Sequence, residues 1–269
     1  MGREVSVKPT QQVIYYQNEL TDEFSKAQIK ARKIDGNYCY EDDTLLKRIG
    51  HIGWYRVLIR PLAWIYLKLV YHHRIVNKKV LREAADAGFF LYGNHTHPVA
   101  DAFMPSMVSY PKDAYVIVHP ANVSMPVLGR ITPSLGALPL PDDISAAKNF
   151  VKAVKERVQR GCCVAIYPEA HIWPYYTGIR PFPDTSFHYP IQCGKPVFCF
   201  TDTYQKRRFT KRPQIVTYVD GPFYPDATLP AKEQKKRLRN QVYDTMLWRS
   251  QNNSVERIKY MKLEEKCKK

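Results

Sequence analysis

A histidine and an aspartate follow the end of an apolar run, and this placement suits acid–base chemistry. Phe89–Tyr92 has the uninterrupted apolar character of a strand covered on both faces. Gly93 permits a tight exit from that strand, and Pro98 suits the first turn of a helix, where its missing N–H costs nothing. The sequence therefore predicts His95 and Asp101 on one strand-to-helix turn, which is a common place for catalytic side chains.

The same residues allow two readings from other functional classes. His95 and His97 form a His-x-His pair, which with Asp101 offers the donors of a metal-dependent hydrolase. The further ligands that such a site needs follow no recognisable spacing. A non-catalytic basic protein that binds membrane or nucleic acid is the other alternative, but it leaves Asp101 and the later Glu169 without a role.

The elements that must position these residues alternate between apolar strands and amphipathic helices. This alternation predicts an α/β domain with a mixed sheet flanked by helices. The helix near 144–160 has the clearest signal, because its apolar residues recur at spacings of three and four and Gly161 follows as a stop. We expect strands near 89–92, 115–118, 137–140, 162–167, 197–200 and 215–219, and helices near 99–110, 144–160 and 231–249.

Composition divides the chain into a polar extension and one catalytic domain. Residues 1–50 are polar and charged, with one helix expected around Leu20–Ala31, and residues 51–269 form the domain. The 269 residues carry 41 Lys and Arg against 25 Asp and Glu, a formal net charge of +16 that favours an anionic partner. The first residues lack the apolar core of a signal peptide, so we expect a cytoplasmic or cytoplasm-facing protein.

The segment from Trp54 to Val70 is rich in aromatic and aliphatic residues, yet it contains Arg56, Arg60 and Lys68. Each cation costs about 2.5–3.5 kcal/mol at the centre of a bilayer, so a membrane-spanning helix is disfavoured. A helix here has a basic edge and a broad apolar face, which is typical either of a helix in the membrane interface or of a core helix. Pro61 predicts a break or bend after Arg60.

Two motifs together resemble the glycerolipid acyltransferase family, whose lysophosphatidate acyltransferases are familiar members. The first is Asn94-His95 with Asp101, and the second is Tyr167-Pro168-Glu169 at the end of a later apolar strand. The family places its Asp one position closer to the His, and it continues the second motif with Gly-Thr-Arg. The resemblance covers roughly residues 54–250.

The resemblance implies an O-acyltransferase that moves a fatty acyl group from an acyl thioester to the hydroxyl of a lysophospholipid such as 1-acylglycerol-3-phosphate. The thioester is carried by coenzyme A or acyl carrier protein, and no resident cofactor or metal is expected. His95 is the expected base and Asp101 its orienter, with His97 as the alternative base. The anionic membrane surface is an expected partner, nucleic acid is not, and the expected location is the cytoplasmic face of the membrane, peripheral or monotopic.

The second motif differs from the family pattern at the residues that bind the acceptor phosphate in the family. Ala170-His171-Ile172 stands where the family has Gly-Thr-Arg, so the family's Arg is missing. Arg180 and His171 are expected to replace it as anion contacts. Asn94 and Glu169 complete the expected substrate-binding set.

Overall fold

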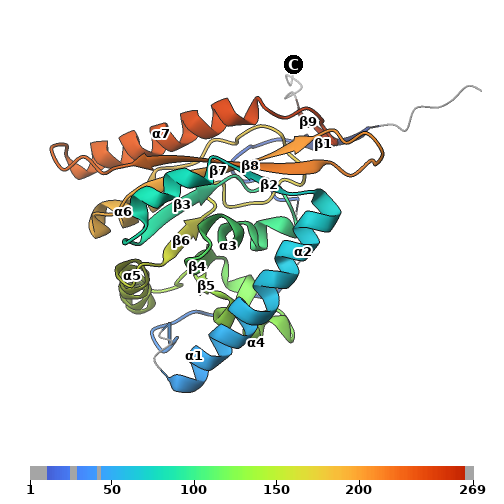
Figure 1. The fold of residues 1–269 in the computed structure, drawn as a ribbon. Coiled ribbons are helices and arrows are strands. Elements are labelled where there is room, and N and C mark those ends of the chain that lie inside the picture. The colour runs from blue at the N-terminus through green and yellow to red at the C-terminus, as the bar shows by residue number, and fades with distance from the viewer. Residues whose placement is uncertain (1–10, 25–28, 41–43, 264–269) are drawn as a thin grey trace, which may run out of the picture.

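A seven-stranded sheet runs through the computed structural model, which describes residues 11–24, 29–40 and 44–263 (Figure 1). The strand order is β2-β8-β7-β3-β6-β4-β5, and only the β7–β8 pair is antiparallel. The expected mixed sheet flanked by helices is therefore confirmed. The strands are β2 (Arg74–Val76), β3 (Phe89–Gly93), β4 (Ala114–Val118), β5 (Ala137–Pro139), β6 (Cys163–Ile166), β7 (Val197–Gln205) and β8 (Gln214–Phe223).

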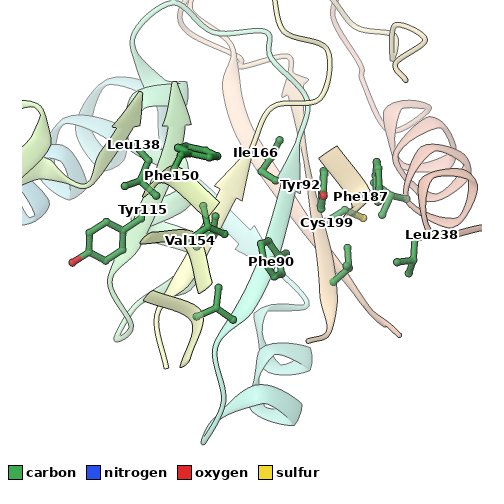
Figure 2. Close-up of a cluster of buried hydrophobic side chains, with 14 of the residues drawn as sticks. Phe90, Tyr92, Tyr115, Leu138, Phe150, Val154, Ile166, Phe187, Cys199 and Leu238 are labelled. Atoms are coloured by element: carbon green, nitrogen blue, oxygen red, sulfur yellow. The ribbon is translucent and has the colours of Figure 1, made fainter. Parts of the chain in front are cut away.

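The strands β3, β6 and β7 lie at the centre of the sheet because both of their faces are apolar. Phe89 and Leu91 belong to the cluster under α2 and α3, whereas Phe90 and Tyr92 belong to the cluster under α5 and α7. Figure 2 shows this second cluster, with Phe90 and Tyr92 near side chains from other elements. The α-helices are α1 (Leu45–His51), α2 (Arg60–Tyr71), α3 (Met104–Ser109), α4 (Leu128–Ile131), α5 (Ile144–Gln159), α6 (His188–Cys193) and α7 (Ala231–Ser250). The π-helix is η1 (Ile52–Ile59), and the 3₁₀ helices are η2 (Lys78–Ala84), η3 (Ala100–Ala102), η4 (Pro120–Val123), η5 (Pro133–Leu135) and η6 (Thr185–Phe187).

The N-terminal region differs from its expected conformation. The predicted helix over Leu20–Ala31 is wrong for the residues described, because 20–24 and 29–31 form turns and irregular backbone, while 25–28 lie outside the described residues. The Asp22 carboxylate accepts the N–H groups of Gln17 and Asn18, which closes a turn in place of a helix. Before this turn, β1 (Gln12–Tyr16) pairs in parallel with β9 (Ile258–Lys262), so the two ends of the described chain lie side by side (Figure 1).

The segment from Leu45 to Tyr71 is helical throughout, in three consecutive parts. The segment η1 is a π-helix, and the N–H of Arg60 that follows it donates a hydrogen bond to the carbonyl of Tyr55. Pro61 lies at the start of α2, where the hydrogen-bond pattern changes from π to α. Proline has no N–H, so its position at the start of α2 leaves no backbone donor unpaired. The expected break after Arg60 is therefore a change from π-helix to α-helix, and the segment stays helical.

This helical segment is attached to the domain through Asp113, which precedes β4. The buried Asp113 carboxylate accepts hydrogen bonds from Arg56, Arg60 and His51, with nitrogen–oxygen distances of 2.6, 3.1 and 3.2 Å. Burial alone raises the pKa of Asp113, but the bonds from His51 and Arg56 outweigh it and hold the pKa below its usual range. The arginines of the expected basic edge are therefore turned toward the domain.

The opposite side of the same helical segment is apolar and exposed. Among the described residues, no helix combines the length and apolarity needed to span a membrane. We call the exposed large apolar side chains between Ile49 and Leu69 the outer apolar face; they are Ile49, Ile52, Trp54, Val57, Leu58, Leu62, Trp64, Ile65 and Leu69.

Replacing Asp113 tests how strongly the helical segment is attached. We expect Asp113→Ala to lower the free energy of unfolding by about 3–5 kcal/mol, because the change leaves a buried arginine without its carboxylate. Lys152→Ala removes one member of an exposed ion pair on α5 and is the control, with an expected change below about 1 kcal/mol. Urea unfolding followed by circular dichroism gives both values, and equal values for the two variants contradict this account.

Candidate active site

The candidate site lies where β3 and β6 end, at the same edge of the sheet. These strands are parallel neighbours, so the loops that follow Gly93 and Ile166 start side by side. A Cβ at position 93 would lie 2.1 Å from the Phe200 ring on β7, so any residue other than glycine here would force that buried ring to move. The sheet order thus brings together the two motifs, although some seventy residues of chain separate them.

His95 and Asp101 form a hydrogen-bonded pair on the turn after β3. The His95 Nδ1 lies 2.7 Å from Asp101 Oδ2, and the same oxygen accepts the N–H groups of Thr96 and His97 at 2.8 and 2.9 Å. Because a carboxylate oxygen only accepts, Nδ1 carries the ring proton and the Nε2 lone pair of the neutral ring is available. The His95 side chain is 23% exposed, whereas that of Asp101 is 2% exposed.

The second motif supports this pair directly through Tyr167. Its ring stacks on the His95 imidazole with centroids 4.4 Å apart, and its hydroxyl donates to the backbone carbonyl of Asp101. Burial raises the pKa of Tyr167 well above its usual value, so the hydroxyl remains a donor. The motif therefore fixes both the plane of the His95 ring and the backbone that carries Asp101.

His97 lies in a different environment from His95. Its Nδ1 accepts the N–H groups of Val99 and Ala100, at 3.2 and 2.9 Å, so the proton of the neutral ring is on Nε2. The ring is 2% exposed and is packed edge-on against Tyr71 and Tyr175. Burial lowers the pKa of His97, which keeps the ring neutral and without a free lone pair.

These hydrogen bonds also bear on the metal-hydrolase alternative. In the part of the chain that the structure describes, no group of three His, Cys, Asp or Glu side chains is arranged to hold a metal ion. His97 Nδ1 and Asp101 Oδ2 are both occupied by backbone N–H groups. These two atoms are therefore committed to the backbone of the turn and are not open to a metal ion.

Asn94 joins two central strands. Its side-chain amide donates to the carbonyl of Asp202 on β7 and accepts the N–H of the same residue, at 3.0 and 2.8 Å. The residue is 2% exposed, so its polar atoms replace the ladder bonds that are lost where β3 ends. A contact between Asn94 and substrate stays a prediction.

Glu169 and Arg180 form a buried ion pair beside the His95 turn. The Nε and Nη2 atoms of Arg180 both lie 3.2 Å from Glu169 Oε2, and the Arg180 residue is 1% exposed. Burial raises the pKa of Glu169 to about 7, although the charge of Arg180 acts in the opposite direction. The guanidinium also lies over the Trp173 ring, 4.9 Å from its centroid, so its partners in this structure are internal.

The remaining expected anion contact, His171, is at the surface. Its side chain is about one third exposed, and Nδ1 lies 3.7 Å from a Glu23 carboxylate oxygen. The structure thus places Glu169, Arg180 and His171 on one loop next to His95 but gives them different exposures. Their contacts with a substrate stay predictions.

Sequence reasoning missed three aromatic residues of the site. Tyr167 was visible as the first residue of the Tyr-Pro-Glu motif, and its hydroxyl was a usable signal. Tyr204 on β7 shares a 2.6 Å hydrogen bond with Thr96, and Trp173 contacts the His95 backbone. No local pattern in the sequence indicates these last two contacts.

Comparison with known proteins finds a matching family model and similar solved structures. Residues 72–201 match the family model described as Acyltransferase. No curated protein matches the chain. Among solved structures, the fold is similar to that of the 1-acyl-sn-glycerophosphate (LPA) acyltransferase PlsC from Thermotoga maritima, with a TM-score of 0.52 and 12% identity over 73% of this chain and 82% of that chain.

The matched range includes both motifs, His95 with Asp101 and Glu169, and the solved structure has a similar fold. The resemblance that these motifs indicate is therefore confirmed at the level of the family model, which residues 72–201 of this chain match.

Proposed function

We propose that the protein transfers a fatty acyl group from an acyl thioester to the hydroxyl of a lysophospholipid such as 1-acylglycerol-3-phosphate. The thioester is carried by coenzyme A or by acyl carrier protein. The match to the Acyltransferase family model supports the reaction class. The acceptor is taken from the similarity to a 1-acyl-sn-glycerophosphate acyltransferase, which has 12% identity to this chain.

The proposed chemistry uses the free nitrogen of His95. Nε2 removes the proton from the acceptor hydroxyl as the hydroxyl oxygen attacks the thioester carbonyl. The C–S bond then breaks, an ester forms, and the proton passes from the imidazolium to the departing thiolate. Asp101 stabilises the imidazolium while it exists, through the 2.7 Å bond to Nδ1.

The observation that carries this proposal is the contrast between the two histidines. His95 has one nitrogen held by a carboxylate and a partly exposed side chain, whereas His97 has its acceptor nitrogen occupied and is buried. A base needs an accessible lone pair, and this contrast supports His95.

The outer apolar face supports docking on a membrane. Arg56 and Arg60 are bound to Asp113, so the helical segment presents aliphatic side chains and two tryptophans to its surroundings. An exposed apolar surface of this kind is typical of a helix that lies in the membrane interface. We propose that it docks on the cytoplasmic, anionic face of a membrane, aided by the basic runs 206–212 and 232–239.

Two asparagine variants separate the histidines. An asparagine at 95 retains a donor for Asp101, and one at 97 retains an acceptor for Ala100, while each removes the corresponding Nε2. We expect His95→Asn to lower the rate of acyl transfer by about 10²–10⁴-fold, whereas His97→Asn retains most of it. The assay is mass-spectrometric detection of diacyl product across coenzyme A and carrier-protein donors and several lysolipid acceptors.

Circular dichroism and urea unfolding confirm that both variants are folded before rates are compared. Full activity in His95→Asn with loss in His97→Asn assigns the base to His97. The absence of any acyl product from the wild-type protein across the screen contradicts the proposed reaction.

A pair of serine substitutions tests membrane docking. We expect Leu62→Ser with Leu69→Ser to weaken binding to phosphatidylglycerol vesicles by at least about tenfold, because a buried leucine contributes about 1.5–3 kcal/mol. Ile144→Ser with Leu247→Ser is the matched control, since both residues are also exposed but lie on α5 and α7. Sedimentation with vesicles measures both, and equal binding of the two double variants contradicts docking through this face.

A further inference from the structure

Trp173 lies between the catalytic turn and both ends of the described chain. It directly follows Ala170-His171-Ile172, the residues that stand in place of the family's Gly-Thr-Arg, and is fully buried. Its ring stacks with Tyr260 of β9, with centroids 4.9 Å apart and planes at 14°, and packs against Tyr16 of β1 at 4.8 Å. Its Nε1–H donates to the carbonyl of Asp22 at 2.8 Å.

The loop that carries Trp173 is hydrogen-bonded to the catalytic turn. The backbone N–H of Trp173 donates to the His95 carbonyl at 3.2 Å, and that of Tyr175 donates to the Thr96 carbonyl at 2.7 Å. These two bonds connect the loop to two consecutive residues, His95 and Thr96, of the turn in which the Asp101 carboxylate holds the His95 imidazole. A shift of Trp173 therefore moves the backbone of His95.

The terminal strands hold this loop from the other side. Tyr260 donates its hydroxyl to the carbonyl of Pro174 at 2.9 Å, next to Trp173. Strands β1 and β9 pair in register from Gln12 with Ile258 to Tyr16 with Lys262. The side chains of Tyr16 and Tyr260 both contact the Trp173 ring. We call the paired strands with these two tyrosines the terminal clasp.

We propose that Trp173 is a positioning residue for His95 and that the terminal clasp holds it in place, so that opening the clasp lowers the rate of the chemical step. The inference rests on the acyl transfer proposed above. The clasp touches neither His95 Nε2 nor Asp101; it acts through the backbone bond from Trp173 to His95. An error of about 1 Å in the position of a catalytic group costs on the order of 10²-fold in rate, so a modest movement of this loop is sufficient.

The alternating faces of β1 provide a matched pair of variants. Tyr16 packs on Trp173, whereas its neighbour Tyr15 is 55% exposed on the opposite face of the same strand. Tyr16→Ala is the test, Tyr15→Ala is the control, and Tyr16→Phe is the conservative variant that retains the ring. Tyr260→Phe is a second, milder test, because it removes only the bond to the Pro174 carbonyl.

We expect Tyr16→Ala to lower kcat by about 10–100-fold with KM within about threefold of wild type, and we expect Tyr16→Phe to restore kcat. Tyr260→Phe lowers kcat in the same direction by a smaller factor. In Tyr16→Ala, the amide hydrogens of Thr96 and His97, which are bonded to Asp101, exchange at least about tenfold faster than in Tyr15→Ala.

Two results overturn the proposal. One is hydrogen exchange at Thr96 and His97 that is the same in Tyr16→Ala and Tyr15→Ala. The other is faster exchange with a kcat equal to that of Tyr15→Ala. If the wild-type protein transfers no acyl group to any acceptor, the proposed function fails, and the exchange measurement still decides whether the clasp is coupled to the His95 turn.

Discussion

One oxygen atom, Oδ2 of Asp101, organises the candidate site. It accepts the Nδ1 proton of His95 and the N–H groups of Thr96 and His97, so it fixes a ring and two peptide groups at once. The turn after β3 has no regular ladder to satisfy its backbone donors, and the buried carboxylate supplies what the sheet no longer does. The orientation of His95 is therefore a consequence of how the strand ends.

Other buried polar side chains around the His95 turn also form hydrogen bonds that satisfy its polar groups. Asn94 pairs with the backbone of Asp202, Tyr167 donates to the Asp101 carbonyl, and Tyr204 bonds to Thr96. Buried polar groups are costly unless they are paired, so each of these bonds restricts the turn to one conformation. The same principle applies to the helical segment, where Asp113 holds the buried arginine and leaves the apolar side chains outside.

Local patterns predicted the parts of the fold that depend on local physics. The period of apolar residues in α5 and the continuous apolar runs of β3 and β6 predicted those elements, and the two strand-end motifs predicted His95, Asp101 and Glu169 as site residues. These local patterns do not predict which residue a given side chain contacts in the folded protein. Periodicity placed Arg56 and Arg60 on one edge of a helix, but it does not say whether that edge meets Asp113 or a lipid surface. The internal pairing of Arg180 with Glu169 and the position of Trp173 depend on loop geometry and on chain ends more than two hundred residues apart, which no local spacing encodes.

The central claim is that Asp101 holds the His95 ring with its proton on Nδ1 and leaves Nε2 free. Long-range ¹H–¹⁵N correlation spectra of the histidine rings measure this directly, because protonated and unprotonated ring nitrogens have well separated ¹⁵N shifts. In the neutral His95 ring we expect the proton on Nδ1, because this atom donates to the Asp101 carboxylate. In the neutral His97 ring we expect the proton on Nε2, because Nδ1 accepts from backbone amides. A neutral His95 ring with its proton on Nε2 contradicts the account, because the nitrogen assigned to the base then has no lone pair with which to accept a proton.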